Sequence, residues 1–455
     1  MSNKNIKNLD VNPCKMCMPM GASIAFKGIE NSVAMIHGSQ GCSTYIRRHM
    51  ATHYNEPVDI ASSSLNEKQT VYGGVDNLKK GLKNVIRIYN PKVIGIATSC
   101  LAETIGEDIN RIVKEFAEEE NIKDTVFVPV TTPGYGGTQY EGYFLALRRV
   151  LEVLTEECEK HNKINIVAAN ISPGDMRRIR DMLESMDVGF TLFPDTGKSL
   201  DGGFTKEYTK ISSEGTKIED IKKMGGAVAT IEMGMLLSEK NSPGKFLENE
   251  YDVPLYKCPV PIGLENTDEF LSLIEKVSGK KMTKRLVEDR ERMLDGMIDS
   301  HKYNGEGRAA IFGEPEIVYS ITKLCIENGI FPAVVATGAK VSGLNDLLRI
   351  AGKQFREKSI VMDDADFDKI KEKVILMGAN ILIGHSDGKF ITEDEGIPLV
   401  RVGFPIHDQI GGQRKVTVGY DGSMNFIDQI TNALLDEKHR VYRKKMYNSY
   451  YIGRG

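Results

Sequence analysis

Three cysteines in the first hundred residues stand in loops that could bring thiols together. Cys17 lies in the stretch CMPMGA, Cys42 ends the stretch HGSQGC, and Cys100 follows the apolar run VIGIATS. Neighbouring glycines let a backbone approach a bound group closely and aim N–H groups at sulfur, and cysteine thiolates are the ligands of iron–sulfur clusters. The spacing identifies no particular site, so two alternatives stay open: a shared metal or cluster site, or three loop cysteines used as small packing residues.

The remaining cysteines carry weaker signals. Cys14 and Cys17 form the pair CKMC. A zinc ribbon needs a second such pair or two histidines, and a thioredoxin-like redox pair needs a preceding strand. The sequence offers neither, so we expect Cys17 to be a ligand and Cys14 a bystander. Cys158 and Cys325 fall in amphipathic patterns and are expected to pack inside helices.

Alternating strands and helices must position these loops. Apolar runs predict strands at 93–97, 164–169, 188–193, 308–312, 331–336 and 380–384, and amphipathic stretches predict helices at 174–186, at 315–328 and from about Glu103. Strands that are apolar on both faces and alternate with helices indicate parallel sheets covered on both sides. Ligands gather beyond the carboxyl ends of such strands, which is where the cysteine loops fall.

The strand–helix unit recurs along the chain and predicts an α/β fold of three Rossmann-like domains with parallel sheets flanked by helices. We expect an N-terminal α/β domain with the cluster cysteines over 1–162, a middle α/β domain over 163–300 and a C-terminal α/β domain over 301–455. A charged helix over 266–300 is expected to lead into the third domain. The polar stretch 203–226 is expected on the surface.

Composition excludes several classes of protein. The 455 residues include 59 Lys plus Arg and 63 Asp plus Glu, a formal net charge of −4, whereas nucleic-acid-binding proteins are usually basic. No apolar run approaches the roughly 18 residues of a membrane span. The N-terminus has no apolar signal core, so we expect a cytoplasmic protein with reduced cysteines. The segment Gly313-Glu314-Pro315 is not a dinucleotide fingerprint, and no phosphate-binding G-x-x-x-x-G-K-[ST] loop is present.

Longer motifs run through all three thirds of the chain. They are C-x-P-x-G-A (17–22), HGSQGC (37–42), RHMATHYNEP (48–57), SSSLNE (62–67), TSCLAETIGEDI (98–109), FPDTGKSLDG (193–202) and RVGFPIHDQIGGQRKVTVGYDGSMNFIDQITN (401–432). With these motifs the sequence resembles the β-type subunits of the nitrogenase component 1 family over nearly its whole length. The resemblance implies three Rossmann-like domains and an α2β2 heterotetramer with a pseudo-symmetric α-type partner.

By motif position, the resemblance implies that Cys17, Cys42 and Cys100 are ligands of an iron–sulfur cluster shared with the α-type subunit. Gly41 would admit close approach to that cluster. Ser99 would donate a hydrogen bond to its sulfur, the alternative being a solvent-facing loop serine. The resemblance also implies an ATP-dependent iron protein as electron donor, and it assigns the substrate-reducing cofactor to the α-type partner.

One departure from the family pattern affects the cluster. The β subunit of the molybdenum–iron protein has a serine after a Thr-Pro pair, and this serine can ligate the oxidised P-cluster. Here Gly134 follows Thr132-Pro133 and offers no oxygen. The shared cluster is therefore expected to be of the P-cluster type or a simpler [4Fe-4S] cluster.

The implied function is electron relay to the partner's cofactor, in nitrogen fixation or in iron–molybdenum cofactor maturation. The loop IHDQIGGQRK (406–415) looks closer to the β-like chain of the assembly scaffold. Two alternatives stay open: a non-catalytic assembly subunit with a structural cluster, and a nitrogenase-like reductase of another substrate. No complete active site is expected in this chain alone.

Several polar residues near the motifs have two interpretations each. His37 either tunes the cluster or caps its loop. A contact role and a loop-capping role are equally open for Ser62, Ser63, Ser64 and Glu67. A solvated helix face or a subunit contact is expected for Arg47, Arg48, His49 and His53. Interface packing is favoured over acid/base chemistry for His407 and Asp408.

Overall fold

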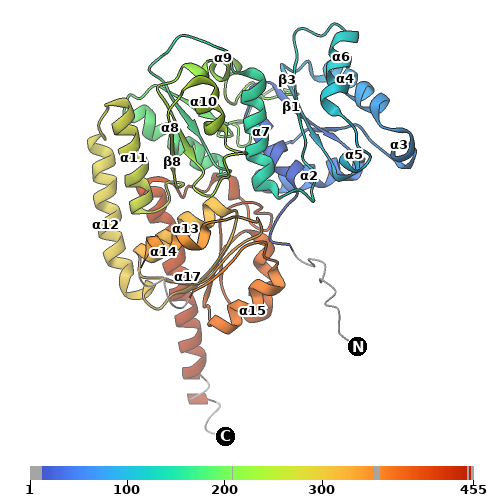
Figure 1. Ribbon diagram of the computed structural model, residues 1–455. Helices are drawn as coiled ribbons and strands as arrows, with labels where there is room; N and C mark the ends of the chain where they lie inside the picture. Colours follow the sequence, from blue (N-terminus) through green and yellow to red (C-terminus); the bar gives the residue numbers. More distant parts are fainter. Residues whose placement is uncertain (1–12, 208, 353–358, 448–449, 452–455) are drawn as a thin grey trace.

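The computed structural model describes residues 13–207, 209–352, 359–447 and 450–451. The strands of these residues form three parallel sheets flanked by helices, which confirms the predicted α/β class (Figure 1). One sheet is built from each successive third of the chain. The domain boundaries themselves stay a prediction.

The first sheet has the order β2 (Ile60–Ser62), β1 (Ser32–His37), β3 (Val93–Thr98), β4 (Val126–Val130). Every residue of β1 and β3 is buried, as expected for strands covered on both faces. The helices of this part are α1 (Met18–Lys27), α2 (Gln40–Tyr54), α3 (Glu67–Tyr72), α4 (Val75–Tyr89), α5 (Cys100–Thr104), α6 (Ile109–Glu119) and α7 (Gln139–Leu154).

The second sheet has the order β6 (Phe190–Phe193), β5 (Ile164–Val167), β7 (Ala229–Met233), β8 (Leu255–Cys258). It is accompanied by α8 (Pro173–Ser185), α9 (Ile218–Lys222), the 3-10 turn η1 (Lys223–Gly226), α10 (Pro243–Tyr251) and α11 (Leu264–Ser278). Ser172 caps α8 by accepting a hydrogen bond from the Asp175 N–H, and a proline occupies the first turn.

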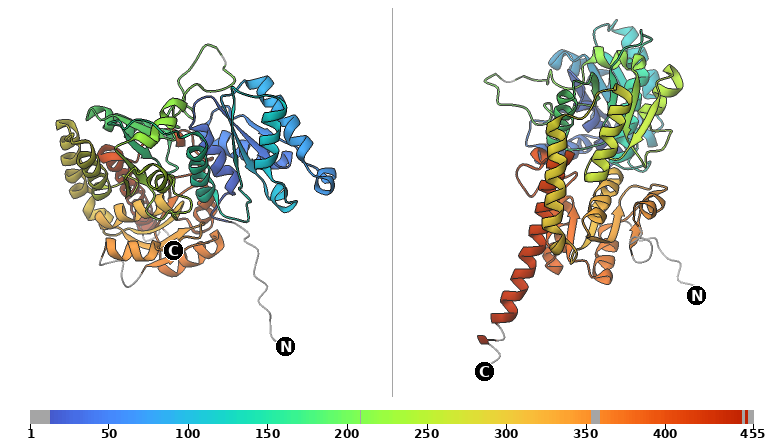
Figure 2. Two further views of the ribbon diagram at one scale, coloured as in Figure 1. Left: turned by 45° about the horizontal axis from the view of Figure 1, so that its top comes forward. Right: turned by 90° about the vertical axis from the view of Figure 1, so that its left-hand side faces the viewer.

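The third sheet has the order β11 (Ile360–Met362), β10 (Phe331–Thr337), β9 (Arg308–Gly313), β12 (Ile381–Gly384), β13 (Leu399–Arg401). Its helical elements are α12 (Lys284–Asn304), α13 (Pro315–Glu327), α14 (Leu344–Ala351), α15 (Phe367–Met377), η3 (Ser386–Gly388), α16 (Lys389–Glu395), η4 (Gly412–Arg414) and α17 (Gly419–Tyr447). Helices α12 and α17 run side by side, and α17 extends beyond the body of the molecule (Figure 2).

Two glycines allow α1 to lie directly on α7. A Cβ atom at Gly21 would collide with the Gln139 carbonyl, and one at Gly142 would collide with the Met18 carbonyl. Such backbone-to-backbone contact leaves little freedom for α1 to shift. Helix α1 is therefore held closely against α7.

Two local predictions were wrong, and a third held only in part. The expected single helix over 266–300 is two helices, α11 and α12, because α11 ends at Gly279 in the left-handed conformation. The helix expected from about Glu103 is a short α5 followed by α6, which Asp108 caps. The stretch 203–226 is exposed only in its first half, because α9 and η1 bury apolar residues, and residue 208 lies outside the described residues.

Within the described residues, no helix has the length and apolar character needed to cross a bilayer.

Candidate functional site

All three predicted cluster cysteines lie at the start of helices beside the first sheet. Cys17 is the N-cap residue of α1, Cys42 lies in the first turn of α2, and Cys100 opens α5. The loops to α2 and α5 leave β1 and β3 together, because these strands are parallel neighbours whose last residues are paired. The sheet thus delivers Cys42 and Cys100 to one edge, at the carboxyl ends of its strands.

Gly134 lies against two of the cysteines, Cys100 and Cys17. Its N–H donates a hydrogen bond to Cys100 Sγ at 3.1 Å. A Cβ atom at Gly134 would lie 3.0 Å from Cys100 Sγ and 3.4 Å from Cys17 Cβ. The absence of a side chain at this position therefore lets the backbone sit against both cysteines.

The thiols also act on one another electrostatically. Burial raises the pKa of Cys17, the Met20 N–H lowers it, and the nearby Cys42 and Cys100 raise it further. The structure therefore brings the three cysteines into one neighbourhood. Cys42 and Cys100 are exposed and Cys17 is partly buried, so Cys42 and Cys100 are not packing residues of this chain's core.

Gly41 and Ser99 flank the cysteines differently. Gly41 is exposed, and the atom nearest to a Cβ built there would be Ser39 Oγ at 3.8 Å, so the space beside it is open. Ser99 is buried, which makes the solvent-facing alternative wrong. Its N–H donates to the His37 carbonyl at 3.0 Å, and its Oγ has no hydrogen-bond partner among the described residues. Donation from Ser99 to a cluster sulfur stays a prediction.

His37 is held at both ring nitrogens. Its Nδ1 lies 2.9 Å from Ser63 Oγ, and its Nε2 bonds the Glu107 carboxylate. Ser63 Oγ also accepts the Gly38 N–H at 3.0 Å, and Glu107 accepts the Gly74 N–H. The ring therefore anchors the loop that leads to α2. Sequence reasoning missed Glu107, because nothing local marks it as the partner of a histidine 70 positions away.

Two further candidates, His53 and Asp408, have structural roles. His53 is buried, so it is not part of a solvated helix face, and its Nδ1 accepts the Ile406 N–H at 2.8 Å. Burial raises the pKa of Asp408, but the hydrogen bonds from Arg401 and Ser386 outweigh it and leave that pKa below its usual value. Arg401 contacts both Asp408 oxygens at 2.7 to 3.0 Å, which leaves this carboxylate poorly suited to acid/base chemistry.

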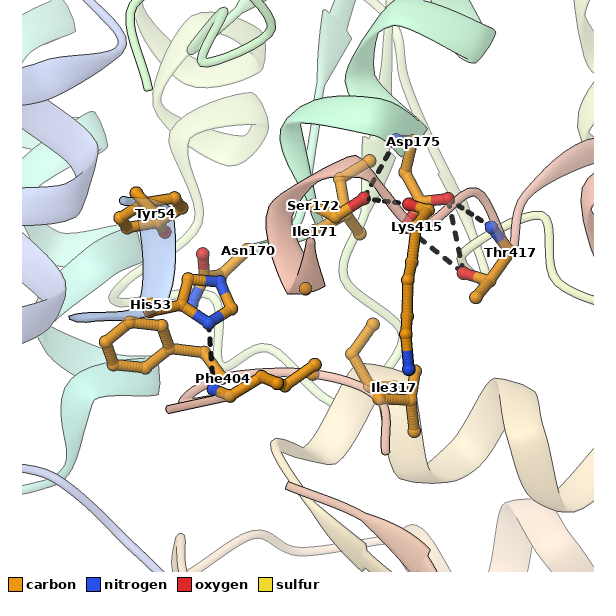
Figure 3. A pocket seen from close by; sticks show the side chains of 14 residues that line it. His53, Tyr54, Asn170, Ile171, Ser172, Asp175, Ile317, Phe404, Lys415 and Thr417 are labelled. Carbon is orange, nitrogen blue, oxygen red and sulfur yellow. Dashed lines mark hydrogen bonds between the residues drawn. The ribbon is translucent and has the colours of Figure 1, made fainter. Parts of the chain in front are cut away.

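The three parts of the chain meet around a small cavity (Figure 3). Its lining comes from α2, from the segment between β5 and α8, from α13 and from the loop after β13, and it includes His53, Asn170, Ile317, Phe404 and Lys415. The cavity measures about 20 Å³, which is room for roughly one water molecule. This junction therefore holds the sheets together and is too small for a large ligand.

Asp175 fastens one wall of that junction. Its carboxylate accepts a hydrogen bond from the Thr417 N–H at 2.5 Å (Figure 3). It also accepts one from the Val418 N–H at 3.0 Å. Burial raises the pKa of Asp175, although these hydrogen bonds oppose the shift. The contact ties the start of α8 to the segment before α17.

Cys158 was expected inside a helix, but the structure places it outside one. Helix α7 ends at Leu154, and Cys158 is exposed in the segment that follows. Cys325 lies in α13 and is buried, as predicted.

The donor set at the first sheet fits a polynuclear cluster. Within the described residues, no three His, Cys, Asp or Glu side chains are arranged around a single metal ion. An iron–sulfur cluster would instead be held by cysteine thiolates from several loops, and a backbone N–H directed at sulfur would tune its reduction potential. Cys17, Cys42, Cys100 and the Gly134 N–H match that chemistry on one side of such a group.

Comparison with known proteins gives one consistent answer. Residues 17–435 match the family described as nitrogenase component 1 type oxidoreductase. The chain is 35% identical to the nitrogenase molybdenum–iron protein beta chain of Clostridium pasteurianum, over 95% of each chain. It is 32% identical to the nitrogenase vanadium–iron protein beta chain of Trichormus variabilis, over 94% of this chain and 95% of the other.

A solved structure described as nitrogenase Cp1 at pH 6.5 superposes with a TM-score of 0.91 at 34% identity, over 95% of both chains. The chain therefore belongs to the nitrogenase component 1 family, among its beta subunits.

Proposed function

We propose that this chain, together with an α-type subunit, holds an iron–sulfur cluster through Cys17, Cys42 and Cys100 and relays electrons through it. The observation that carries the proposal is the convergence of these three cysteines at one sheet edge, with two of them exposed. In a reducing compartment exposed thiols stay free, so they can bind a cluster that also takes ligands from a second chain. The cytoplasm, which we propose as the location, is such a compartment.

The cluster would accept and pass on single electrons. Residues of this chain would influence its reduction potential and the space around it. The Gly134 N–H directed at Cys100 Sγ stabilises negative charge on that sulfur and so favours the reduced state. Ser99 offers a further donor, and the open space beside Gly41 admits close approach. Because the ligands are divided between two chains, cluster binding is part of assembly.

The names of the relatives favour a subunit of a catalytic nitrogenase complex over a subunit of a cofactor-assembly scaffold. They are beta chains of molybdenum–iron and vanadium–iron nitrogenase proteins. We therefore propose an α-type subunit as the partner that carries the substrate-reducing cofactor and an ATP-dependent iron protein as the electron donor. Reduction of acetylene or dinitrogen by the purified complex, with iron protein and ATP, is the expected activity.

A second candidate is the cofactor-assembly scaffold. Gly134 favours it, because this position supplies no oxygen ligand for a redox-linked change at the cluster. Transfer of a cofactor precursor from the complex to apo-enzyme, without reduction of acetylene, would identify the scaffold. Reduction of acetylene at a steady rate would identify the catalytic subunit.

The cluster assignment is tested with a matched pair of variants. Cys42 and Cys158 are both exposed, but only Cys42 lies at the proposed site. We expect Cys42→Ala to lose iron and the cluster signal in low-temperature EPR of the complex, and Cys158→Ala to keep both. An unchanged cluster signal in Cys42→Ala would overturn the assignment.

A further inference from the structure

Residues 13–17, here called the strap, lead from the third sheet to the first α-helix. At the third sheet, Pro13 forms an antiparallel bridge with Asp366, and the Cys14 N–H donates to the Ala365 carbonyl at 3.4 Å. Directly after β10, a Cβ atom at Gly338 would collide with the Cys14 carbonyl. The strap therefore lies tightly against the carboxyl ends of the third sheet's strands.

That edge is where α/β sheets bind ligands, at the point where the strand order reverses. In this sheet the reversal falls between β9 and β12. Cys14 is only 2% exposed and packs with the buried apolar side chains of this sheet, among them Phe312, Val334 and Phe367. The chain's own strap thus takes up space that a ligand would use in a related fold.

His385 holds the thiol of Cys14. It follows β12 directly, and its Nε2 lies 3.6 Å from Cys14 Sγ. Asp387 Oδ2 lies 3.3 Å from the other ring nitrogen, and the rings of Phe312 and Phe367 pack edge-on against the imidazole. Burial alone would lower the pKa of His385, but Asp387 and Cys14 raise it to about 10. The imidazole therefore lies between the sulfur of Cys14 and the carboxylate of Asp387.

The other end of the strap is fastened to α7. The Met16 N–H donates to Gln139 Oε1 at 2.6 Å, and the Gln139 N–H donates to the Met16 carbonyl at 2.9 Å. Cys17 itself forms an antiparallel bridge with Thr138. Only two residues separate Cys14 from Cys17, and a chain spans at most about 3.6 Å per residue. If the backbone at Cys14 moves, the short segment between the two cysteines therefore forces the backbone at Cys17 to move as well.

We propose that Cys14, His385 and Gly338 are positioning residues for Cys17, which fasten the strap in the third sheet's ligand crevice and so fix the first cluster ligand. The inference rests on the proposed function of Cys17. It gives Cys14 a role where the sequence suggested a bystander. It also gives the third sheet a part in a site that is otherwise built on the first.

The test compares Cys14→Ala, Cys14→Ser and Cys325→Ala in the anaerobically purified complex. The serine keeps a hydrogen-bonding group beside His385, and Cys325 is an equally buried cysteine far from the strap in sequence. We expect Cys14→Ala to shift the EPR g values of the cluster and to release iron to a chelator about tenfold faster, as loss of supporting contacts around a metal site does. Cys14→Ser should restore most of both properties, and Cys325→Ala should change neither.

Two further variants distinguish an error in the proposed function from an error in the positioning role. Cys17→Ala tests the proposed function itself, and Gly338→Ala displaces the strap without altering any thiol. If Cys17→Ala leaves the cluster spectrum unchanged, the proposed function is wrong. If Cys17→Ala changes the spectrum while Cys14→Ala leaves spectrum and iron release as in the native complex, the positioning role is wrong. Should Gly338→Ala fail to fold, the comparison of Cys14→Ala with Cys14→Ser is enough to test the positioning role.

Discussion

Acid should destabilise the folded chain through His53. This histidine lies on α2 at the junction of the three sheets, where its Nδ1 accepts the Ile406 N–H at 2.8 Å and its ring packs edge-on against Phe404. Burial, together with a smaller effect of the nearby His407, lowers the pKa of His53 from 6.5 to about 3. The fold therefore holds the ring neutral over a pH range in which the unfolded chain protonates it.

The sign and size of the effect follow from proton binding. Below pH 6.5 the unfolded chain binds a proton at His53 that the folded chain does not, so the free energy of unfolding falls as the pH falls from 6.5 toward 3. At 1.36 kcal/mol per pKa unit, the loss is about 1.4 kcal/mol between pH 7.5 and 5.5 and about 5 kcal/mol over the whole interval.

The assay is urea denaturation of the native chain and of His53→Asn at pH 7.5 and 5.5. Asparagine can still accept a hydrogen bond but does not titrate. The pH-dependent loss of stability should be about 1.4 kcal/mol smaller in the variant. Burial raises the pKa of Glu314 and of Glu316 to about 7, so these groups stabilise the fold at low pH and lose this contribution as the pH rises toward 7. Both proteins share them, so they cancel in the comparison. An equal pH dependence in the two proteins would refute the reasoning.

Three further changes have defined outcomes. Gly21→Ala puts a methyl group into the backbone of α7 and should lower the free energy of unfolding by about 1 to 3 kcal/mol; an unchanged melting temperature in calorimetry would contradict this. Gly134→Ser adds an oxygen next to Cys100 and should leave assembly intact. With a P-cluster present, the EPR spectra of the oxidised and reduced variant should differ from each other more than those of the native complex do. Identical oxidised and reduced spectra would count against serine acting as a cluster ligand at this position. Glu107→Gln weakens the bond to His37 and should cost about 1.5 kcal/mol in thermal denaturation, whereas no loss would show that the contact contributes nothing.

The sheets were predictable because their strands are apolar on both faces. The run 93–97 became β3 and 308–312 became β9 with nearly the predicted bounds. The breaks inside helical stretches were harder, because helix periodicity continues across a short interruption. At Gly279 the left-handed conformation ends α11, and the amphipathic pattern resumes in α12.

The site was only partly predictable. Cys17, Cys42 and Cys100 stood out because each lies in a loop beside small residues, but only the family resemblance singled them out as cluster ligands. The fold brings the three together. The contacts that hold them come from distant positions. Glu107 bonds His37, and His385 meets Cys14 across 371 positions of sequence. No local pattern encodes such pairs, because they form only when segments that are distant in sequence fold against one another.

The most direct test of the central claim is the alkylation of cysteines in the anaerobically purified complex, read by mass spectrometry before and after iron chelation. Cys42, Cys100 and Cys158 are all exposed in this chain. If the first two bind iron, they should resist alkylation in the loaded complex and become reactive after chelation, whereas Cys158 should react under both conditions. Alkylation of Cys42 and Cys100 as fast as that of Cys158 in the iron-loaded complex would contradict the account.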